Sequence, residues 1–338
     1  MSRAPKLVAF AAAALLTVGL AACSSSSDDN GGDGDFTPIT IEHALGTTTI
    51  TEKPERVATV NWANQEVPLA LGVVPVGMAA ANFGDDDGDG MLPWVSEKLD
   101  ELGGEAPVLF DETDGVDFEA VADTNPDVIL AAYSGLTQED YDTLSEIAPV
   151  VAYPETAWGT PWQKMIELNS KGMGMEAEGQ ALVADLQAEI SAAAAKAPQL
   201  QDKSVMFLTH VDATDLSEVS FYTTHDTRAM FFEDLGLQTP ASIATASAET
   251  DAFSLTRSAE QIDGLNDVDI IVTYGDDTLV STLKADPLLS QMPAVAGGAI
   301  VALPSTPLGT AANPTPLSIS WVLDDYVAML AEAADKSK

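Results

Sequence analysis

The stretch EAEGQALVADLQAEISAAAAK, residues 176–196, decides the fold that we expect for this chain of 338 residues. Its apolar side chains recur three or four positions apart, as at Leu182, Leu186 and Ile190, and acidic or amide residues fill much of the opposite face. This period predicts one long helix, which ends before Pro198. At about 1.5 Å per residue, such a helix is roughly 31 Å long, the width of a small domain. A rod of this length between two similar halves predicts a two-lobed clamp with a ligand between the lobes; an ordinary amphipathic helix within one domain is the alternative.

The segments on either side of this helix repeat the same order of features. Glu119, Asn125 and Tyr133 in the first segment have counterparts of the same type and spacing in the second, namely Glu260, Asn266 and Tyr274. An apolar run precedes each tyrosine. Two such related segments indicate a duplicated architecture.

Short apolar runs alternate with helical patterns in both segments, which predicts parallel sheets. A hairpin is expected at residues 36–51, and a helix with a capping box begins at residues 258–261. The expected strands are residues 56–60, 73–77, 128–132, 150–153, 204–209, 269–273 and 300–303.

Residues 1–22 have the features of an export signal. Two basic residues precede the apolar run 7–20, which is short for a membrane-spanning helix. The run ends in Leu-Ala-Ala-Cys, which resembles a bacterial lipobox whose cysteine, here Cys23, receives the lipid. Residues 23–35 then form a flexible polar tether. The sequence therefore predicts a protein anchored by Cys23 to the extracytoplasmic face of the cell membrane.

The chain is strongly acidic, with a formal net charge of −39. Residues 1–22 hold two of its basic residues and no acidic one, so the remaining chain carries a net charge of −41. Such a surface repels nucleic acid and anionic lipid headgroups, and we expect neither as a partner.

Motifs of covalent catalysis and of phosphate binding are missing from the sequence. There is no G-x-S-x-G, no P-loop and no G-x-G-x-x-G after a strand, and the single cysteine is assigned to the anchor. The three histidines, His43, His210 and His225, are scattered and do not make a metal motif. We therefore expect a binding protein with no catalytic step, no intrinsic cofactor and no resident metal.

One acidic motif remains a candidate for Ca²⁺. Asp85, Asp87 and Asp89 match the first half of a D-x-D-x-D-G loop, but its twelfth position is Ser96 in place of a bidentate glutamate. An acidic surface turn is the alternative.

The ligands of α/β lobes bind beyond the carboxyl ends of the strands. This rule and the neighbouring loops select Asn61, His210, the loop 308–316 and seven residues that we predict to bind the ligand: Trp62, Tyr133, Ser134, Trp158, Tyr222, Arg228 and Tyr274. Most of them are aromatic and only one is charged, which suits a bulky, largely uncharged ligand.

Several segments resemble actinobacterial iron-siderophore ABC transporter substrate-binding lipoproteins. They are PERVATVNWANQEVPLALGVVPVG (54–77), VDFEAVADTNPDVILAAYSGLTQEDYDTLSEIAPVVAYP (116–154), VSTLKADPLLSQMPAV (280–295) and PLGTAANPTPLS (307–318). The likeness extends from about residue 39 onward. It implies the α/β fold of class III substrate-binding proteins, with two Rossmann-like lobes of parallel-rich sheets joined by a single long rigid helix.

The resemblance also implies a partner and a ligand. In this family an acidic residue on each lobe docks onto arginines of an ABC permease, and the matching positions are Glu119 and Glu260; compensation of a helix dipole is the alternative role. Catecholate binders of this kind use several arginines, whereas only Arg56, Arg228 and Arg257 follow the signal here. This scarcity favours a ferric siderophore of the hydroxamate or mixed type.

We therefore expect a monomeric receptor that captures a chelated Fe(III)-siderophore and delivers it to an ABC importer. Its predicted divisions are an N-terminal lobe at 36–160, connecting helices at 161–198 and a C-terminal lobe at 199–338. Haem or cobalamin, with an axial ligand such as His210, His225 or Tyr133, is an alternative cargo. An anchored hydrolase is the alternative from a different class.

Overall fold

Five parallel strands form the sheet of the first half of the chain in the computed structural model, which describes residues 36–337. Their order across the sheet is β5-β4-β3-β6-β7. The strands are short apolar runs, and all four residues of β6 are buried, as in strands covered on both faces. The strands are β3 (Val57–Thr59), β4 (Gly77–Ala79), β5 (Val108–Phe110), β6 (Val128–Ala131) and β7 (Val150–Ala152).

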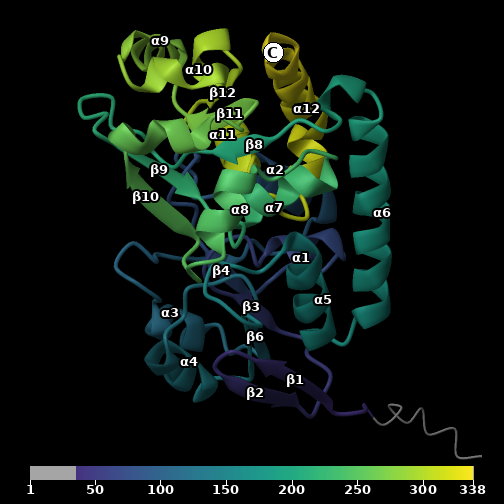
Figure 1. Cartoon of the computed structure of the whole chain (residues 1–338). Coiled ribbons are helices and arrows are strands. Elements are labelled where there is room, and N and C mark those ends of the chain that lie inside the picture. Colours follow the sequence, from purple (N-terminus) through teal and green to yellow (C-terminus); the bar gives the residue numbers. More distant parts are fainter. Residues whose placement is uncertain (1–35, 338) are drawn as a thin grey trace, which may run out of the picture. The chain divides into compact units, whose positions relative to one another are not determined.

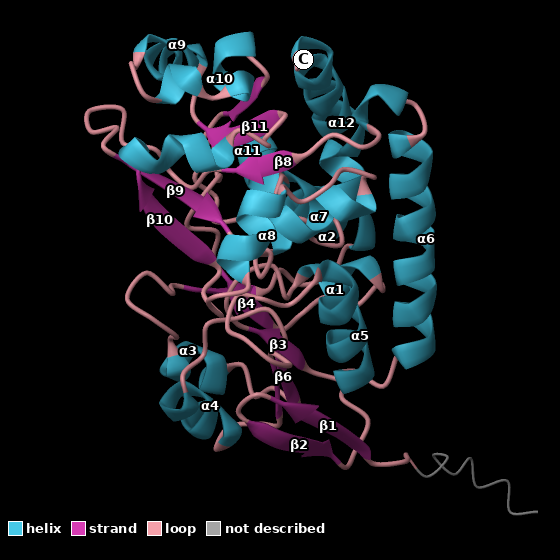
Figure 2. Ribbon diagram, viewed as in Figure 1, coloured by secondary structure: helices cyan, strands magenta, loops and turns pink. Residues whose placement is uncertain are grey.

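Helices flank this sheet on both sides, α3 and α4 on one and α1 and α5 on the other (Figure 2). The helices of this half are α1 (Glu66–Ala70), α2 (Pro93–Leu102), α3 (Phe118–Asp123), α4 (Gln138–Ser145) and α5 (Trp162–Gly172). The predicted hairpin at 36–51 is confirmed as β1 (Ile39–His43) and β2 (Gly46–Ile50). His43 is buried in it and its Nε2 lies 3.0 Å from the hydroxyl of Thr48, so this histidine is part of the packing.

The second half contains a smaller parallel sheet in the order β12-β11-β8, with an antiparallel ribbon of two strands beside it. Its strands are β8 (Val205–Phe207), β9 (Glu218–Tyr222), β10 (Ser254–Ser258), β11 (Ile270–Tyr274) and β12 (Ile300–Leu303). Its helices are η1 (Pro198–Leu200), α7 (Thr227–Asp234), α8 (Ala241–Ser247), η2 (Ala259–Leu265), α9 (Asp277–Ala285), η3 (Leu289–Gln291), α10 (Pro293–Gly297), α11 (Pro307–Ala311) and α12 (Ser318–Lys336).

The predicted long helix is confirmed as α6 (Glu176–Ala194), about 28 Å of rod that runs past both halves from the level of α5 to that of α12 (Figure 1). Leu186 and Ile190 of its apolar stripe are buried. A side chain on Gly179 would place its Cβ 1.9 Å from Oγ of Ser170 on α5, so only glycine lets the two helices approach this closely.

The internal repeat corresponds to equivalent pieces of structure. Tyr274 is the last residue of β11, and Tyr133 lies two residues beyond the end of β6; both strands are inner strands of their sheets. Likewise α1 and α7 are each followed by a glycine with φ of 81°, Gly72 and Gly236. The α/β fold class with parallel sheets is confirmed.

Two local predictions are wrong. The strand expected at 73–77 is displaced to β4, because the chain first turns out of α1, where the amide of Val73 donates to the carbonyl of Pro68 at 2.8 Å. The capping box expected at 258–261 is also wrong: the predicted helix begins there as the 3₁₀-helix η2, but Oγ of Ser258 accepts from the amide of Glu260 at 3.3 Å.

The predicted lobe boundaries stay predictions, because residues 36–338 form a single unit by their contacts. The signal, the tether and Cys23 lie outside the described residues. Within the described part of the chain, no helix is both long and apolar enough to cross a membrane.

Candidate functional site

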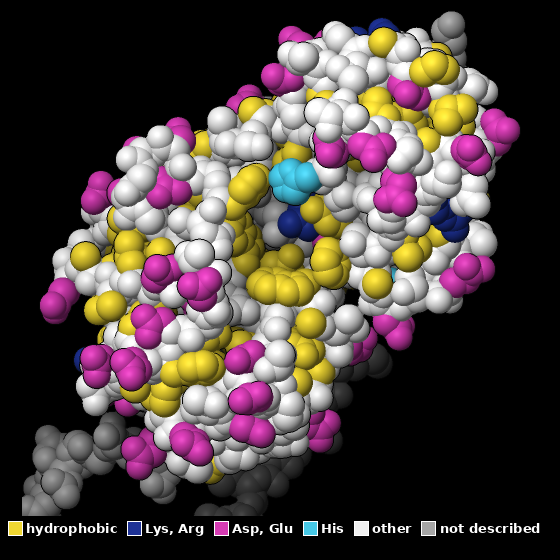
Figure 3. Space-filling view, turned by 90° about the vertical axis from the view of Figure 1, so that its left-hand side faces the viewer, with side chains coloured by type: hydrophobic (Ala, Val, Ile, Leu, Met, Phe, Trp, Pro, Cys, Tyr) yellow, Lys and Arg dark blue, Asp and Glu magenta, His cyan; other side chains and the backbone are white. Residues whose placement is uncertain are grey.

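A cavity of about 570 Å³ lies where loops from the two halves meet. This volume falls within the range of sites that enclose small molecules. Figure 3 shows the hollow on the surface: hydrophobic side chains line it, a cationic side chain lies inside it and a histidine stands at its edge. Acidic side chains are scattered over the surrounding surface.

The wall from the first half is built at the carboxyl ends of its five strands. Strands β3 and β6 are neighbours in the middle of the sheet although they are distant in the chain, so the strand order reverses between them. Loops that follow such a pair diverge and leave a crevice. The lining residues of this half are Asn61, Trp62, Ala63 and Gln65 after β3; residues 79–83 and Leu92 at and after the end of β4; Glu112, Gly115 and Val116 after β5; Tyr133, Gly135, Leu136 and Asp140 after β6; and Trp158 after β7.

Asn64 ties the two central loops together. Its side chain is fully buried, and Nδ2 donates to the carbonyls of Val60 and Tyr133, both at 2.8 Å. Its Oδ1 accepts from the amide of Tyr133 at 3.1 Å and from Nδ2 of Asn169 on α5 at 2.9 Å. One side chain thereby fixes the backbone that carries Tyr133.

Three residues of the cavity wall have left-handed backbone conformations. They are Asn61 (φ 60°), Ala63 (φ 60°) and Trp158 (φ 61°). This region is disfavoured for alanine and tryptophan, and such strain persists where the surrounding structure holds it in place. A hydrogen bond contributes to this restraint at Trp158, whose amide donates to the carbonyl of Ser134 at 2.9 Å.

Tyr133 and Trp158 form an aromatic corner of the cavity. Their rings meet edge to face, with centroids 5.4 Å apart and planes at 81°. The indole lies over Gly135, where a Cβ would come within 2.3 Å of the tryptophan Nε1. The absence of a side chain at Gly135 therefore sets the position of the indole.

The opposite wall centres on Arg228 at the start of α7. Its Nη1 lies 2.8 Å from Oδ2 of Asp226, its Nε donates to the hydroxyl of Tyr274 at 3.0 Å, and its guanidinium lies 4.4 Å from the centre of the Tyr222 ring. Burial acts to lower the pKa of Arg228, but Asp226 and the surrounding tyrosines raise it above its usual value, so the guanidinium stays charged. Burial raises the pKa of Tyr222, which stays a neutral phenol.

His210 covers the edge of this wall. Its ring stacks on Tyr274, with centroids 4.7 Å apart and planes at 20°, and Phe83 from the opposite half lies edge-on to both rings. Burial, and then the nearby Arg228, lower the pKa of His210. His225 is not in the cavity wall, and its Nε2 lies 3.1 Å from the carbonyl of Ser247.

Polar contacts join the two walls at the floor of the cavity. The hydroxyl of Tyr133 lies 3.4 Å from Oγ1 of Thr227 and from Nδ2 of Asn313. Thr227 donates to Oδ1 of Asn313 at 2.7 Å. All three side chains are buried, so this floor links β6 of one half to α7 and the loop after α11 of the other.

The structure brings six of the seven predicted ligand-binding residues to this cavity. They are Trp62, Tyr133, Trp158, Tyr222, Arg228 and Tyr274. Ser134 does not line the cavity: its side chain is fully buried, and its backbone carbonyl accepts a hydrogen bond from the amide of Trp158. Asn313 comes from the loop 308–316, which the strand-end rule also selected. Sequence reasoning missed Phe83 and Glu112, and the rule would have selected both had β4 and β5 been placed correctly.

Glu119 and Glu260 lie outside the cavity wall. Each is exposed in the first turn of its short helix, α3 and η2 respectively. Their proposed contact with a permease is compatible with this exposure.

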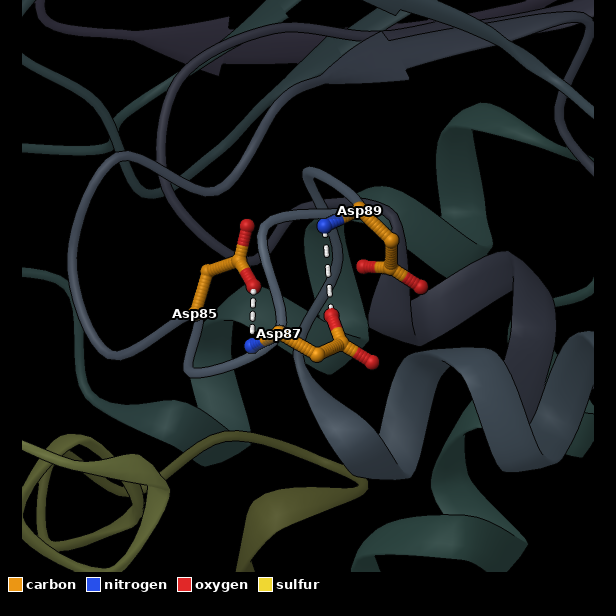
Figure 4. A group of neighbouring side chains, drawn as sticks. All are labelled: Asp85, Asp87 and Asp89. Carbon is orange, nitrogen blue, oxygen red and sulfur yellow. Dashed lines mark hydrogen bonds between the residues drawn. The ribbon is translucent and has the colours of Figure 1, made fainter.

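The acidic loop predicted as a Ca²⁺ candidate brings its three carboxylates within 4.8 Å of one another. Backbone amides of the loop donate to several of the carboxylate oxygens. Asp85 accepts from Asp87 and Asp87 accepts from Asp89, as Figure 4 shows, and Asp85 also accepts from Gly88 and Gly90. These hydrogen bonds lower the pKa of Asp85, and the bond from the amide of Gly90 has the largest effect. A hydrogen-bonded acidic turn explains the arrangement, and Ca²⁺ binding stays a prediction.

Comparison with known proteins gives the family. A family model described as periplasmic binding protein matches residues 57–307. The crystal structure of PiaA from Streptococcus pneumoniae in complex with ferrichrome is 46% identical, with a TM-score of 0.85, and the match covers 89% of this chain and 100% of that one.

More distant relatives agree with this match. A periplasmic solute binding protein from Mycobacterium smegmatis is 26% identical, with a TM-score of 0.71, over 88% of this chain and 99% of that one. The "Probable siderophore-binding lipoprotein YfiY" of Bacillus subtilis is 28% identical over 79% of this chain and 76% of its own length. The chain belongs to the periplasmic binding protein family.

Proposed function

We propose that this protein captures a ferric siderophore in the cavity between its two halves and delivers it to an ABC importer. The observation that carries the proposal is the wall itself: aromatic rings from both sheets surround one guanidinium in a volume of about 570 Å³. Ring faces hold a bulky, weakly charged ligand, and the arginine supplies donors for chelate oxygens. The 46% identity to a protein whose structure was solved with ferrichrome supports this class of ligand.

The charges of the cavity favour a ferric complex without net negative charge. Arg228 is the single lysine or arginine among the described residues that line it, and Asp226 already neutralises it. Three hydroxamates neutralise Fe³⁺, whereas three catecholates leave the complex triply anionic. The wall therefore suits hydroxamate or mixed siderophores better than catecholates.

The proposal also includes delivery of the siderophore to the permease and attachment of the protein to the membrane by a lipid. Glu119 and Glu260, exposed on equivalent elements of the repeat, would contact arginines of the permease, and Cys23 would carry the lipid that holds the protein at the membrane. Incorporation of radiolabelled palmitate into a Cys23→Ala protein would contradict the anchor.

Titration of intrinsic tryptophan fluorescence tests the cargo, because Trp62 and Trp158 line the cavity. Ferrichrome, haem and cobalamin are titrated in parallel into the purified protein. We expect saturable quenching by ferrichrome at the lowest concentration. Tighter binding of haem or cobalamin than of ferrichrome would contradict the siderophore assignment. A separate assay with ester, glycoside and phosphate substrates tests for a hydrolase, which turnover that is lost with Tyr133→Phe would favour.

A further inference from the structure

Glu112 is an acidic side chain in the cavity wall that the proposed capture of a siderophore does not yet use. It follows β5 and lies in the wall of the first half, partly buried. Among the described residues, no lysine, arginine or histidine forms an ion pair with it. It thus differs from Asp226, the other buried carboxylate of the cavity, which pairs with Arg228.

A single asparagine holds this carboxylate in place. Oε2 of Glu112 accepts from the backbone amide of Asn61 at 2.9 Å and from its Nδ2 at 3.0 Å, while Oδ1 of Asn61 accepts from the amide of Gly135 at 3.0 Å. Asn61 has a left-handed backbone at this double contact, a conformation that asparagine adopts more readily than most residues. The network joins the loops after β5, β3 and β6, so the carboxylate has a fixed position beside the aromatic corner.

The remaining charges of the cavity do not neutralise Glu112. Asp140 from α4 and Asp226 from the start of α7 are also acidic, and Arg228 is committed to Asp226. His210 stands at the edge of the other wall, and Asp111 and Asp114 flank Glu112 on its own loop. A bound ligand would therefore meet excess negative charge on this side of the cavity.

We propose, on the basis of the siderophore-binding function above, that Glu112 selects the charge of the ligand: it favours ferric complexes that carry an ammonium group and disfavours complexes with net negative charge. Coulomb interactions in a partly buried site act over several ångströms with limited screening. A fixed carboxylate beside the chelate then discriminates between complexes of equal shape and different charge.

The protonation of Glu112 makes this selection depend on pH. Burial raises its pKa to about 7, against the opposing hydrogen bonds from Asn61. The side chain is mostly neutral at pH 6 and mostly ionised at pH 8. Preference for a cationic over an anionic complex should increase between these values, and His210, whose pKa is lowered, stays largely neutral over most of this range.

A series of ferrioxamine B derivatives tests the proposal, because one chelate can carry three charges. The parent has a free ammonium group, the N-acetylated form is neutral, and the N-succinylated form is anionic. Each is titrated by tryptophan fluorescence at pH 6 and pH 8 against the wild-type protein, Glu112→Gln and His210→Gln, with ferrichrome as the reference ligand. Thermal unfolding checks that each variant is folded.

We expect the ratio of affinities for the cationic and anionic forms to rise about tenfold from pH 6 to pH 8 in the wild-type protein. Glu112→Gln should remove this rise, and His210→Gln should keep it. A ratio that is independent of pH in the wild-type protein, a rise that persists in Glu112→Gln, or failure of the cationic form to bind a protein that binds ferrichrome would overturn the proposal. Absence of binding by every ferric complex would instead overturn the siderophore function itself.

Discussion

Trp158 occupies a backbone conformation that its side chain disfavours, and three contacts hold it there. The carbonyl of Ser134 accepts from its amide, the ring of Tyr133 supports its indole, and Gly135 leaves room beneath it. The indole lines the cavity, so the strained backbone of Trp158 forms part of the proposed binding surface. The position of one aromatic ring thus depends on a residue that carries no side chain.

Gly135→Ala tests this dependence. The new Cβ would lie 2.3 Å from Nε1 of Trp158, so the ring must move out of the cavity wall. One buried ring contributes about 0.5–1.5 kcal/mol beyond the area that it buries, so we expect ferrichrome affinity to fall by up to about tenfold. Fluorescence titration measures this change.

Gly264→Ala is the matched control, because a Cβ there meets no atom within 4 Å and the backbone has an ordinary φ. It should leave affinity unchanged. If Gly135→Ala binds as tightly as the control, the indole does not contact the ligand as we describe.

The strand-end rule located much of this site from sequence, and its failures have physical reasons. Tyr133 and Trp158 were found because buried apolar strands precede them. Glu112 was not, because its strand β5 has only three residues and Val108 is 49% exposed, so no apolar run marks it. Ser134 was included because the rule selects every residue after a strand end and takes no account of burial, and Ser134 is fully buried outside the cavity wall.

The N-terminus of α12 is capped by a residue from the other half of the chain. Glu66 begins α1, is fully buried, and its Oε2 accepts from the amides of Leu317 at 2.9 Å and Ser318 at 3.4 Å. Its Oε1 accepts from Nε1 of Trp94 on α2 at 2.7 Å. The carboxylate satisfies helix amides and faces the positive end of the helix dipole, so three elements from both halves meet on it.

Glu66→Gln should lower the free energy of unfolding by about 1–3 kcal/mol, because an amide NH₂ would face an N–H donor in a site without water access. Urea unfolding followed by circular dichroism measures the loss. The matched control is Glu178→Gln, an exposed glutamate in the first turn of α6 that should change stability little. Equal stability of both variants would mean that Glu66 does not join the halves energetically.

Elements with a strong apolar period could be predicted, whereas those stabilised mainly by tertiary contacts could not. The helix α6 and strand β6 were found from their apolar side chains alone. The ribbon strand β10, Ser254–Ser258, was missed because four of its five side chains are polar and none is fully buried, and only pairing with β9 makes it a strand. Glu66 was missed as a cap because its helix lies 251 residues further along the chain.

At the scale of the whole molecule, the proposed docking to the permease would contact both halves of the protein, one through Glu119 and the other through Glu260. The two residues occupy matching positions of the repeat, and both are exposed and outside the cavity. Two charge-assisted contacts at about 1.5–3 kcal/mol each give modest affinity together with sensitivity to their spacing.

The double variant Glu119→Ala, Glu260→Ala should therefore keep its affinity for ferrichrome. It should lose most of its ability to support uptake of ⁵⁵Fe-ferrichrome by cells, and each single variant should give an intermediate rate of uptake. The control is Glu176→Ala, Glu178→Ala on α6, which removes the same charge from another exposed surface and should be near silent. Uptake by the first pair at the wild-type rate would contradict the docking role.

The central claim is that the cavity between the two sheets holds the iron complex. Diffraction from co-crystals with ferrichrome, recorded above the iron absorption edge, locates the metal directly by its anomalous signal. We predict one iron peak inside the cavity, with the chelate between the rings of Trp158 and Tyr133 on one side and Arg228 on the other. A peak outside this cavity, or a bound complex that contacts none of these three residues, would contradict the account.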